Sequence, residues 1–163
     1  RHGGYIDKYM GDGIMAIFGL ERASMAEACL DAVAAALGML DSLEELNAYL
    51  KKQFDTEFRI GIGIHVGSVI IGEMGHPQKM QFTAIGDAVN IASRIESATK
   101  ELHVSLLVSE QVQALLGDAA RYGVSGRVNL KGKSGEHLLY EVTGLNVAVP
   151  ETEPLPGART PVP

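Results

Sequence analysis

The chain has 163 residues, 46% of them hydrophobic and 21% charged, which is enough for one domain with a buried core. Its net charge of -6 and the scattered positions of its fourteen Lys and Arg residues argue against a general nucleic-acid-binding surface. The single cysteine, Cys29, excludes an internal disulfide framework and fits a reducing, cytoplasmic compartment. We expect Cys29 to be a small buried hydrophobic residue. No apolar run reaches the roughly 18 residues of a membrane span, so we expect no membrane segment in this chain.

The chain begins with a predicted β-hairpin and a long helix. Two apolar runs, Tyr5–Met10 and Ile14–Phe18, flank the turn Gly11-Asp12-Gly13, which supplies the glycines of a tight hairpin. Ser24 and Glu27 form a predicted capping box at the start of the helix. A predicted buried stripe follows in steps of three and four residues, made of Met25, Ala28, Ala32, Ala36, Met39, Leu43, Leu46 and Leu50.

The middle of the chain is rich in predicted strands. Isoleucine and valine alternate with glycine or histidine from residue 60 to 66, which is the period of a strand. We expect Gly67-Ser68 to turn the chain back into a second strand, Val69–Gly72, and residues 75–79 to form a polar loop. The glycines match neither a phosphate loop nor a dinucleotide-binding motif, so Gly61 and Gly63 indicate a twist or close backbone packing.

Strands and helices alternate in the C-terminal half. We expect a helix from Asp87, its N-cap, to about Glu101, and a short helix over Ser109–Leu116 that is capped by Ser109. Hairpins that alternate with helices indicate an α+β fold, a mixed sheet with helices packed against it. We expect one domain over residues 1–146 and a Pro-rich linker or disordered tail over residues 147–163. The expected strands of this half are Gln81–Ile85, Val104–Val108, and the pair Arg121–Leu130 and His137–Val142.

Three stretches carry residues suited to phosphate chemistry, and each also has a simpler interpretation. Asp12 at a hairpin tip can bind Mg²⁺ or Mn²⁺, although aspartate is also common in turns for its backbone geometry. Asn90 and Arg94, one helical turn apart, can hold a ribose oxygen and a phosphate, or can belong to a solvated helix face. The two lysines of the turn Leu130–Gly135 can reach a polyphosphate, or can lie on an exposed hairpin tip.

These stretches together resemble the catalytic domain of class III nucleotidyl cyclases, from about Gly3 to Gly144. The resemblance rests on GGYIDKYMGDGIMAIFG, RIGIGIHVGSVIIGEMG, FTAIGDAVNIASR and VNLKGKSG, in this order. It implies a ferredoxin-like α+β core of the βαββαβ type, elaborated by further strands, and a head-to-tail homodimer with active sites at its interface. It also implies an N-terminally truncated domain, because the family's first strand and first metal-binding aspartate are not present after Arg1. We therefore expect a piece of a longer protein that carries sensing or membrane elements.

The resemblance implies roles for single residues. The purine-reading pair is expected to select ATP, because a lysine donates to N1 of adenine and a threonine hydroxyl accepts from its exocyclic amine, whereas guanine reverses this pattern. A Lys and Thr pair is similar to the bacterial-type Lys/Thr adenylate cyclase subclass. By resemblance, Lys8 and Thr83 read the purine, Asn90 and Arg94 stabilise the transition state, Asp12 is the second of two metal-binding aspartates, and Lys131 holds the terminal phosphates.

The implied activity is that of an adenylate cyclase, which converts ATP to 3′,5′-cyclic AMP and pyrophosphate for intracellular signalling. The ribose 3′-oxygen would attack the α-phosphate with the help of two divalent metal ions, Mg²⁺ or Mn²⁺. The alternative is a non-catalytic cyclase-like domain that dimerises or binds nucleotide for regulation. The intact polar site residues favour the enzyme, whereas the missing first strand favours the alternative for this chain alone.

Overall fold

The computed structural model describes residues 2–22, 24–76, 79–129 and 135–150. The helices are α1 (Met25–Phe54), α2 (Asp87–Leu102) and α3 (Glu110–Leu116), with a 3₁₀ turn, η1 (Gly117–Ala119), after α3. The strands are β1 (Tyr5–Met10), β2 (Gly13–Ile17), β3 (Ile62–Ile64), β4 (Ile70–His76), β5 (Lys79–Ile85), β6 (Leu106–Ser109), β7 (Ala120–Asn129) and β8 (Glu136–Leu145).

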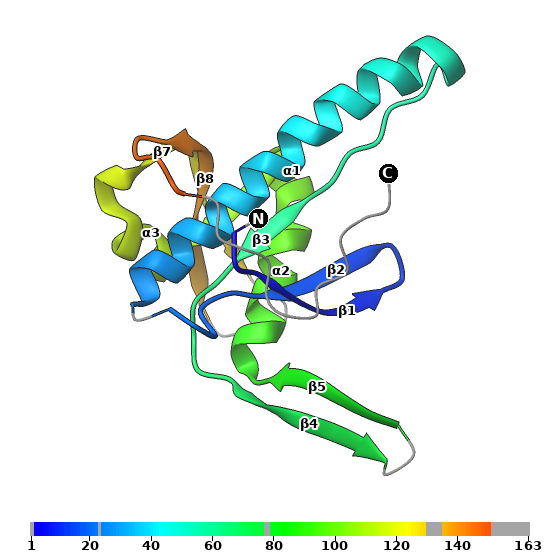
Figure 1. Ribbon diagram of the computed structural model, residues 1–163. Helices are drawn as coiled ribbons and strands as arrows, with labels where there is room; N and C mark the ends of the chain where they lie inside the picture. Colours follow the sequence, from blue (N-terminus) through cyan, green and yellow to red (C-terminus); the bar gives the residue numbers. More distant parts are fainter. Residues whose placement is uncertain (1, 23, 77–78, 130–134, 151–163) are drawn as a thin grey trace.

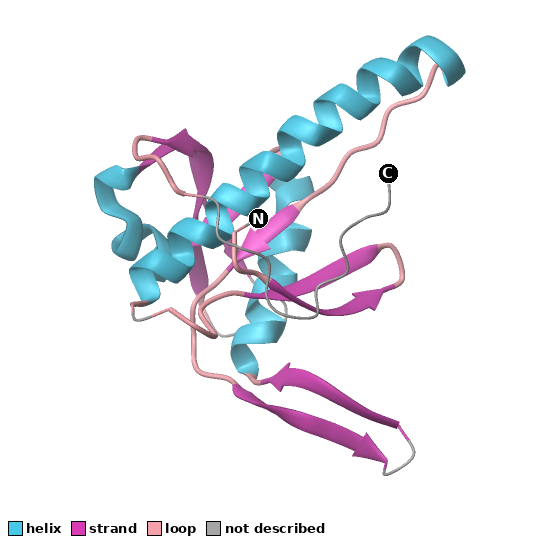
Figure 2. Cartoon of the chain, in the orientation of Figure 1, coloured by secondary structure: helices cyan, strands magenta, loops and turns pink. Residues whose placement is uncertain are grey.

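A four-stranded mixed sheet forms the centre of the molecule. Its strand order is β3-β6-β8-β7, with β3 parallel to β6 and the other neighbours antiparallel. Two separate hairpins, β1–β2 and β4–β5, lie beside this sheet, and the second projects away from it (Figure 1). Figure 2 shows helices and strands mixed along the whole described chain. The predicted α+β fold with a mixed sheet is therefore confirmed.

Strand β6 divides the core into two layers. Its successive residues point to opposite faces, as the strand period requires. Leu106 and Val108 pack with α1 and α3 on one face, and Leu107 packs with α2 on the other. All three side chains are at most 1% exposed. The sheet is therefore covered by helices on both faces, which explains why β6 reads as a continuous apolar run.

Two glycines let α2 lie close against β3. A methyl group at Gly63 would overlap the backbone of Ala92 and Glu96, and one at Gly61 would overlap the Thr99 side chain. Glycine is needed at position 63 because backbone meets backbone there, and neither group of atoms can rotate away. The prediction of close packing at these glycines is confirmed, and the contacts hold α2 against β3.

The predicted buried stripe of α1 is partly wrong. Ala32 and Ala36 are buried as predicted, but Met25, Met39 and Leu46 are 65%, 48% and 45% exposed. The helix runs well beyond the sheet, so its C-terminal half has no layer to pack against (Figure 1). The buried face also includes Cys29 and Val33, which the predicted stripe left out.

Cys29 is the small buried hydrophobe that the sequence predicted. It is 4% exposed, and burial raises the pKa of its thiol to about 11. A thiol with such a pKa is almost entirely protonated at neutral pH, so Cys29 is a poor nucleophile.

The predicted connections around β3 and β4 are wrong. Gly67-Ser68 does not turn β3 back onto β4, because β3 pairs with β6 across the α2 crossover, while β4 pairs with β5. The predicted polar loop at residues 75–79 is also mostly strand, since β4 runs to His76 and β5 begins at Lys79. Three strands, β3, β4 and β5, therefore lie between α1 and α2, and β5 includes the predicted strand Gln81–Ile85.

The helix caps in the structure agree only in part with those predicted from the sequence. The Ser24 hydroxyl accepts a hydrogen bond of 3.2 Å from the Glu27 backbone N–H, as a cap of α1 should. Asp87 is the first residue of α2 and not its N-cap, which is Gly86. Ser109 stands at the N-cap position of α3 without capping it, because its hydroxyl lies 2.9 Å from His65 Nδ1.

Some predicted features lie outside the described residues. These are the turn at residues 130–134, with Lys131 and Lys133, and the Pro-rich tail from residue 151 onward. The strands on either side of that turn, β7 and β8, pair as predicted. In the part of the chain that the structure describes, no helix combines the length and apolar character needed to cross a bilayer.

Candidate active site

Strand β1 contains a β-bulge that turns two adjacent side chains toward the same face. Ile6 pairs with Ala16 and Lys8 pairs with Met15, so Asp7 is an extra residue in β1. Cross-strand partners share a face, which places Lys8 on the half-buried face with Met15, while Ile6 on the other face is 52% exposed. In a regular strand Asp7 and Lys8 would point to opposite faces.

The Asp7 carboxylate joins Lys8 to Thr83 of β5. Thr83 Oγ1 donates a hydrogen bond of 2.8 Å to Asp7 Oδ2, and Lys8 Nζ lies 3.5 Å from the same oxygen. The Asp7 side chain is only 1% exposed, whereas that of Lys8 is 37% exposed. An edge-to-face contact between Tyr5 and Phe82, with ring centroids 5.5 Å apart, holds β1 against β5. The structure therefore brings the predicted purine-reading pair together.

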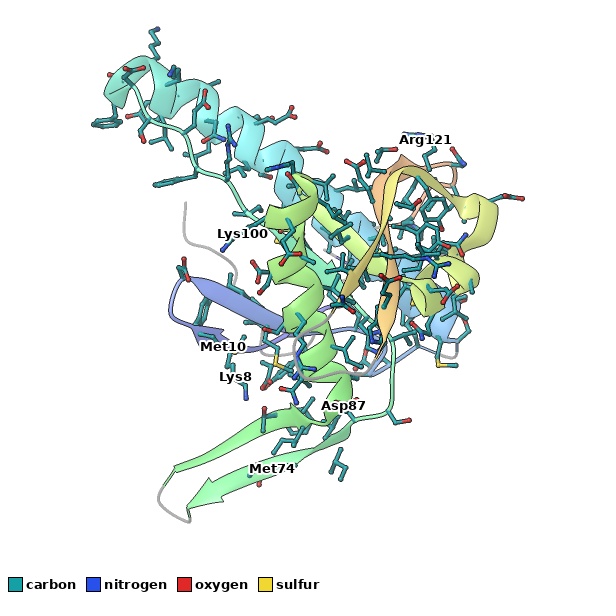
Figure 3. All side chains as sticks on the ribbon, turned by 180° about the vertical axis from the view of Figure 1, so that it is seen from behind. Lys8, Met10, Met74, Asp87, Lys100 and Arg121 are labelled. Carbon is teal, nitrogen blue, oxygen red and sulfur yellow. The ribbon has the colours of Figure 1, made fainter. Side chains whose placement is uncertain are left out.

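The Lys8 ammonium is the accessible part of this cluster. Figure 3 shows Lys8 on the side of the β1–β2 hairpin that faces the β4–β5 hairpin. Across the β4–β5 ladder, Gly72 is the partner of Thr83, and a methyl group at Gly72 would have nothing within 4 Å. Since cross-strand partners share a face, the glycine leaves open space beside Thr83.

Asn90 and Arg94 lie one turn apart in α2, away from the core face that carries Ile95 and Ala98. Asn90 is exposed and Arg94 is half-buried. Arg94 Nη1 is buried and has no hydrogen-bond partner among the described residues. A guanidinium stays charged and its N–H groups need acceptors, so a buried unpaired nitrogen suits an anionic ligand.

Asp12 lies at the exposed tip of the β1–β2 hairpin, beside Gly11 with its φ of +64°. Among the residues that the structure describes, no three or more His, Cys, Asp or Glu side chains are grouped to hold a metal ion. Mg²⁺ is commonly bound by one or two carboxylates together with substrate phosphates. Among the described residues, Asp12 can therefore offer a metal ion one carboxylate.

Sequence reasoning missed Asp7 as a site residue. Its position next to Lys8 was the available signal, but strand alternation places the two side chains on opposite faces. Only the bulge brings Asp7 under both Lys8 and Thr83. The remaining predicted site residue, Lys131, lies outside the described part of the chain.

The family model of the adenylate and guanylate cyclase catalytic domain matches residues 2–144. The chain belongs to this family. The family assignment predicted from the motifs is thus confirmed. Cyclase catalytic domains bind a nucleotide, work as dimers and generally use divalent metal ions.

Among curated proteins, this cyclase domain is similar to Adenylate cyclase 1 of Rhizobium meliloti, with 35% identity over 93% of this chain and 23% of that protein. It is also similar to an adenylate cyclase of Anabaena cylindrica, with 36% identity over 86% of this chain and 28% of that protein. The chain therefore spans less than a third of the length of these relatives.

Among solved structures, the cyclase domain resembles the adenylyl cyclase CyaB from P. aeruginosa, with a TM-score of 0.78 and 31% identity over 86% of this chain and 72% of that one. It also resembles the guanylyl cyclase Cya2, with a TM-score of 0.77 and 28% identity over 91% of this chain and 76% of that one. The fold is thus common to cyclases named for either purine, so it does not by itself indicate the purine.

Proposed function

We propose that this cyclase domain is the catalytic domain of an adenylate cyclase, which converts ATP to 3′,5′-cyclic AMP and pyrophosphate. The observation that carries the proposal is the meeting of Lys8 and Thr83 at Asp7 Oδ2. The names of the Rhizobium and Anabaena relatives support the same substrate.

The Lys8 and Thr83 pair matches the edge of adenine. The Lys8 ammonium can only donate, which suits the N1 acceptor of adenine, and the Thr83 oxygen can accept from the exocyclic amine. Guanine presents a donor at N1 and an acceptor at O6, so it would meet both groups with the wrong polarity. Gly72, the cross-strand partner of Thr83, leaves the space beside Thr83 open.

The α2 pair would act on the sugar and the phosphates. Arg94, with its buried and unpaired Nη1, is suited to the charge that develops on the α-phosphate during the transfer. Asn90, one turn before it, would orient the ribose for attack by the 3′-oxygen. Lys131 would hold the pyrophosphate that leaves.

Divalent metal ions, Mg²⁺ or Mn²⁺, would complete the site, and Asp12 would bind one of them. Such ions activate the attacking hydroxyl and neutralise phosphate charge when bound. Because Asp12 is a single carboxylate at an exposed tip, its metal would need further ligands from the polyphosphate and from elsewhere in the protein.

A homodimer with shared sites fits this arrangement. Asp12 of one chain would meet Lys8, Thr83, Asn90, Arg94 and Lys131 of the other, so each chain would contribute to two sites. We also propose that residues 1–146 form the catalytic domain, that residues 147–163 form a linker or tail, and that the domain works in the cytoplasm.

The test is turnover of ATP and GTP by the full-length protein with Mg²⁺ or Mn²⁺, with cyclic nucleotide and pyrophosphate identified as products. We expect cyclic AMP from ATP at a rate well above that from GTP. Nucleotide binding without cyclic AMP formation would overturn the catalytic assignment and favour the regulatory alternative. A preference for GTP would overturn the assigned purine alone.

A further inference from the structure

We propose that Asp7 is a positioning residue that fixes the Thr83 hydroxyl as a hydrogen-bond acceptor toward the purine, and thereby selects adenine over guanine. The inference rests on the proposed function, because it concerns the same nucleotide site.

The Thr83 hydroxyl proton is engaged in a hydrogen bond within the protein. A threonine hydroxyl has one O–H donor and two lone pairs. A carboxylate only accepts, so the 2.8 Å hydrogen bond to Asp7 Oδ2 takes the single proton of Thr83 Oγ1. The hydroxyl can then only accept from a ligand. It therefore accepts a hydrogen bond from the exocyclic amine of adenine. With guanine it would face O6, which is also an acceptor, and no hydrogen bond could form.

The Lys8 ammonium keeps this arrangement in place. It lies 3.5 Å from the same carboxylate oxygen and is 37% exposed, so it can hold Asp7 and still reach a ligand. A carboxylate paired with an ammonium only accepts hydrogen bonds, so it cannot donate to Thr83. Lys8 and Thr83 thus present a donor and an acceptor side by side, as the edge of adenine requires.

Asp7 is a costly residue in purely structural terms. Its side chain is 1% exposed, and its other oxygen, Oδ1, is buried without a hydrogen-bond partner among the described residues. Burying a carboxylate with half of its acceptors unpaired lowers stability. The bulge that turns Asp7 inward beside Lys8 also removes a regular pair from the β1–β2 ladder. These features favour a role in recognition over a role in stabilising the fold.

The experiment compares the affinities of the full-length protein for ATP and GTP, measured by competition against a fluorescent ATP analogue. Asp7→Asn places an amide beside Thr83 that can donate a hydrogen bond to the Thr83 oxygen. The Thr83 hydroxyl proton is then free to point toward the ligand. We expect the ratio of the GTP to the ATP dissociation constant to fall about tenfold. Asp7→Leu, an apolar side chain of similar shape suited to burial, should lower the ratio in the same way.

Two controls separate recognition from folding. Asp31→Asn makes the same change in another buried acid, which is 3% exposed and paired with Arg22, and it should leave the ratio unchanged. In a Thr83→Val background, Asp7→Asn should change the ratio by less than about threefold, because the hydroxyl that Asp7 orients is gone. Melting temperatures of all variants record the structural effect separately.

The outcomes distinguish the inference from the proposed function. If the wild-type protein prefers ATP but Asp7→Asn and Asp7→Leu keep its ratio within about twofold, the role of Asp7 is wrong and the proposed function stands. If Asp7→Asn has the same effect with Thr83 and with Val at position 83, Asp7 does not act through the hydroxyl. If the wild-type protein binds neither nucleotide, both proposals fall.

Discussion

Gly63 of β3 lies directly against the backbone of Glu96 in α2, and a methyl group at Gly63 would overlap that backbone. This contact sets how closely α2 approaches the sheet. Because Asn90 and Arg94 belong to the same helix, the contact also sets where both side chains lie relative to β3.

Replacing Gly63 with alanine should therefore lower the stability of the domain. The expected loss is about 1–3 kcal/mol in the free energy of unfolding, because α2 must shift away from β3. Urea unfolding of the chain measures it. Gly38→Ala is the matched control, since Gly38 lies inside α1 with nothing within 4 Å of an added methyl group. That change should raise stability by about 0.5–1 kcal/mol, and equal losses in both variants would contradict the packing account.

Arg94→Ala should remove catalysis and leave the fold intact. The expected loss in kcat is about 10²–10³, as for other groups that stabilise transition-state charge. The melting temperature should stay the same or rise, because the buried Nη1 has no partner among the described residues to lose. Arg94→Lys should recover little activity, since an ammonium cannot replace a planar guanidinium.

Arg121→Ala is the control for this arginine. Arg121 Nη1 donates to the Leu145 carbonyl at 2.7 Å, and Figure 3 shows Arg121 well away from Lys8. Its loss should lower stability and leave kcat nearly unchanged. A large fall in kcat in Arg121→Ala, or a fall in melting temperature alone in Arg94→Ala, would contradict the assigned roles.

Mixing two inactive variants tests the shared sites. Asp12→Ala and Arg94→Ala chains, mixed in equal amounts and allowed to exchange, should form heterodimers with one intact site. Activity should return to about a quarter of that of the wild-type protein, since half the dimers are mixed and each has one working site. Cyclic AMP formation in the mixture measures it.

Lys8→Ala mixed with Arg94→Ala provides the matched negative control. Lys8 and Arg94 are proposed to come from the same chain in each site, so every site of that heterodimer contains one defect. Recovery in this second mixture, or failure of the first with both variants folded and dimeric, would show that the residues are not divided between chains as proposed.

The sequence predicted the positions of the helices and strands better than it predicted which strands pair. The alternation around Ile62 and Ile64 identified a strand, and Gly61 and Gly63 correctly indicated close packing. Sequence could not show that β3 pairs with β6 and not with β4, because pairing depends on a crossover through α2. Similarly, the period of α1 marked an apolar face but not where the sheet beneath it ends, so Leu46 proved exposed.

The candidate site also has a part that the sequence predicted and a part that it did not. Lys8 and Thr83 could be named from motifs, and their meeting across two hairpins follows from the fold. Asp7 could not be predicted, because a bulge breaks the alternation on which strand faces are predicted. Site residues can therefore be predicted from the sequence where the residue type decides the chemistry. They cannot be predicted where a local irregularity of the backbone, such as a bulge, redirects a side chain.

The measurement that tests the central claim most directly is the ratio of kcat/KM for ATP to kcat/KM for GTP, in the full-length wild-type protein and in Lys8→Glu. The account predicts a wild-type preference for ATP and a ratio at least about 100-fold lower in Lys8→Glu, because glutamate cannot donate to N1 of adenine and can accept from N1 of guanine. A wild-type preference for GTP, or a ratio that Lys8→Glu leaves unchanged, would contradict it.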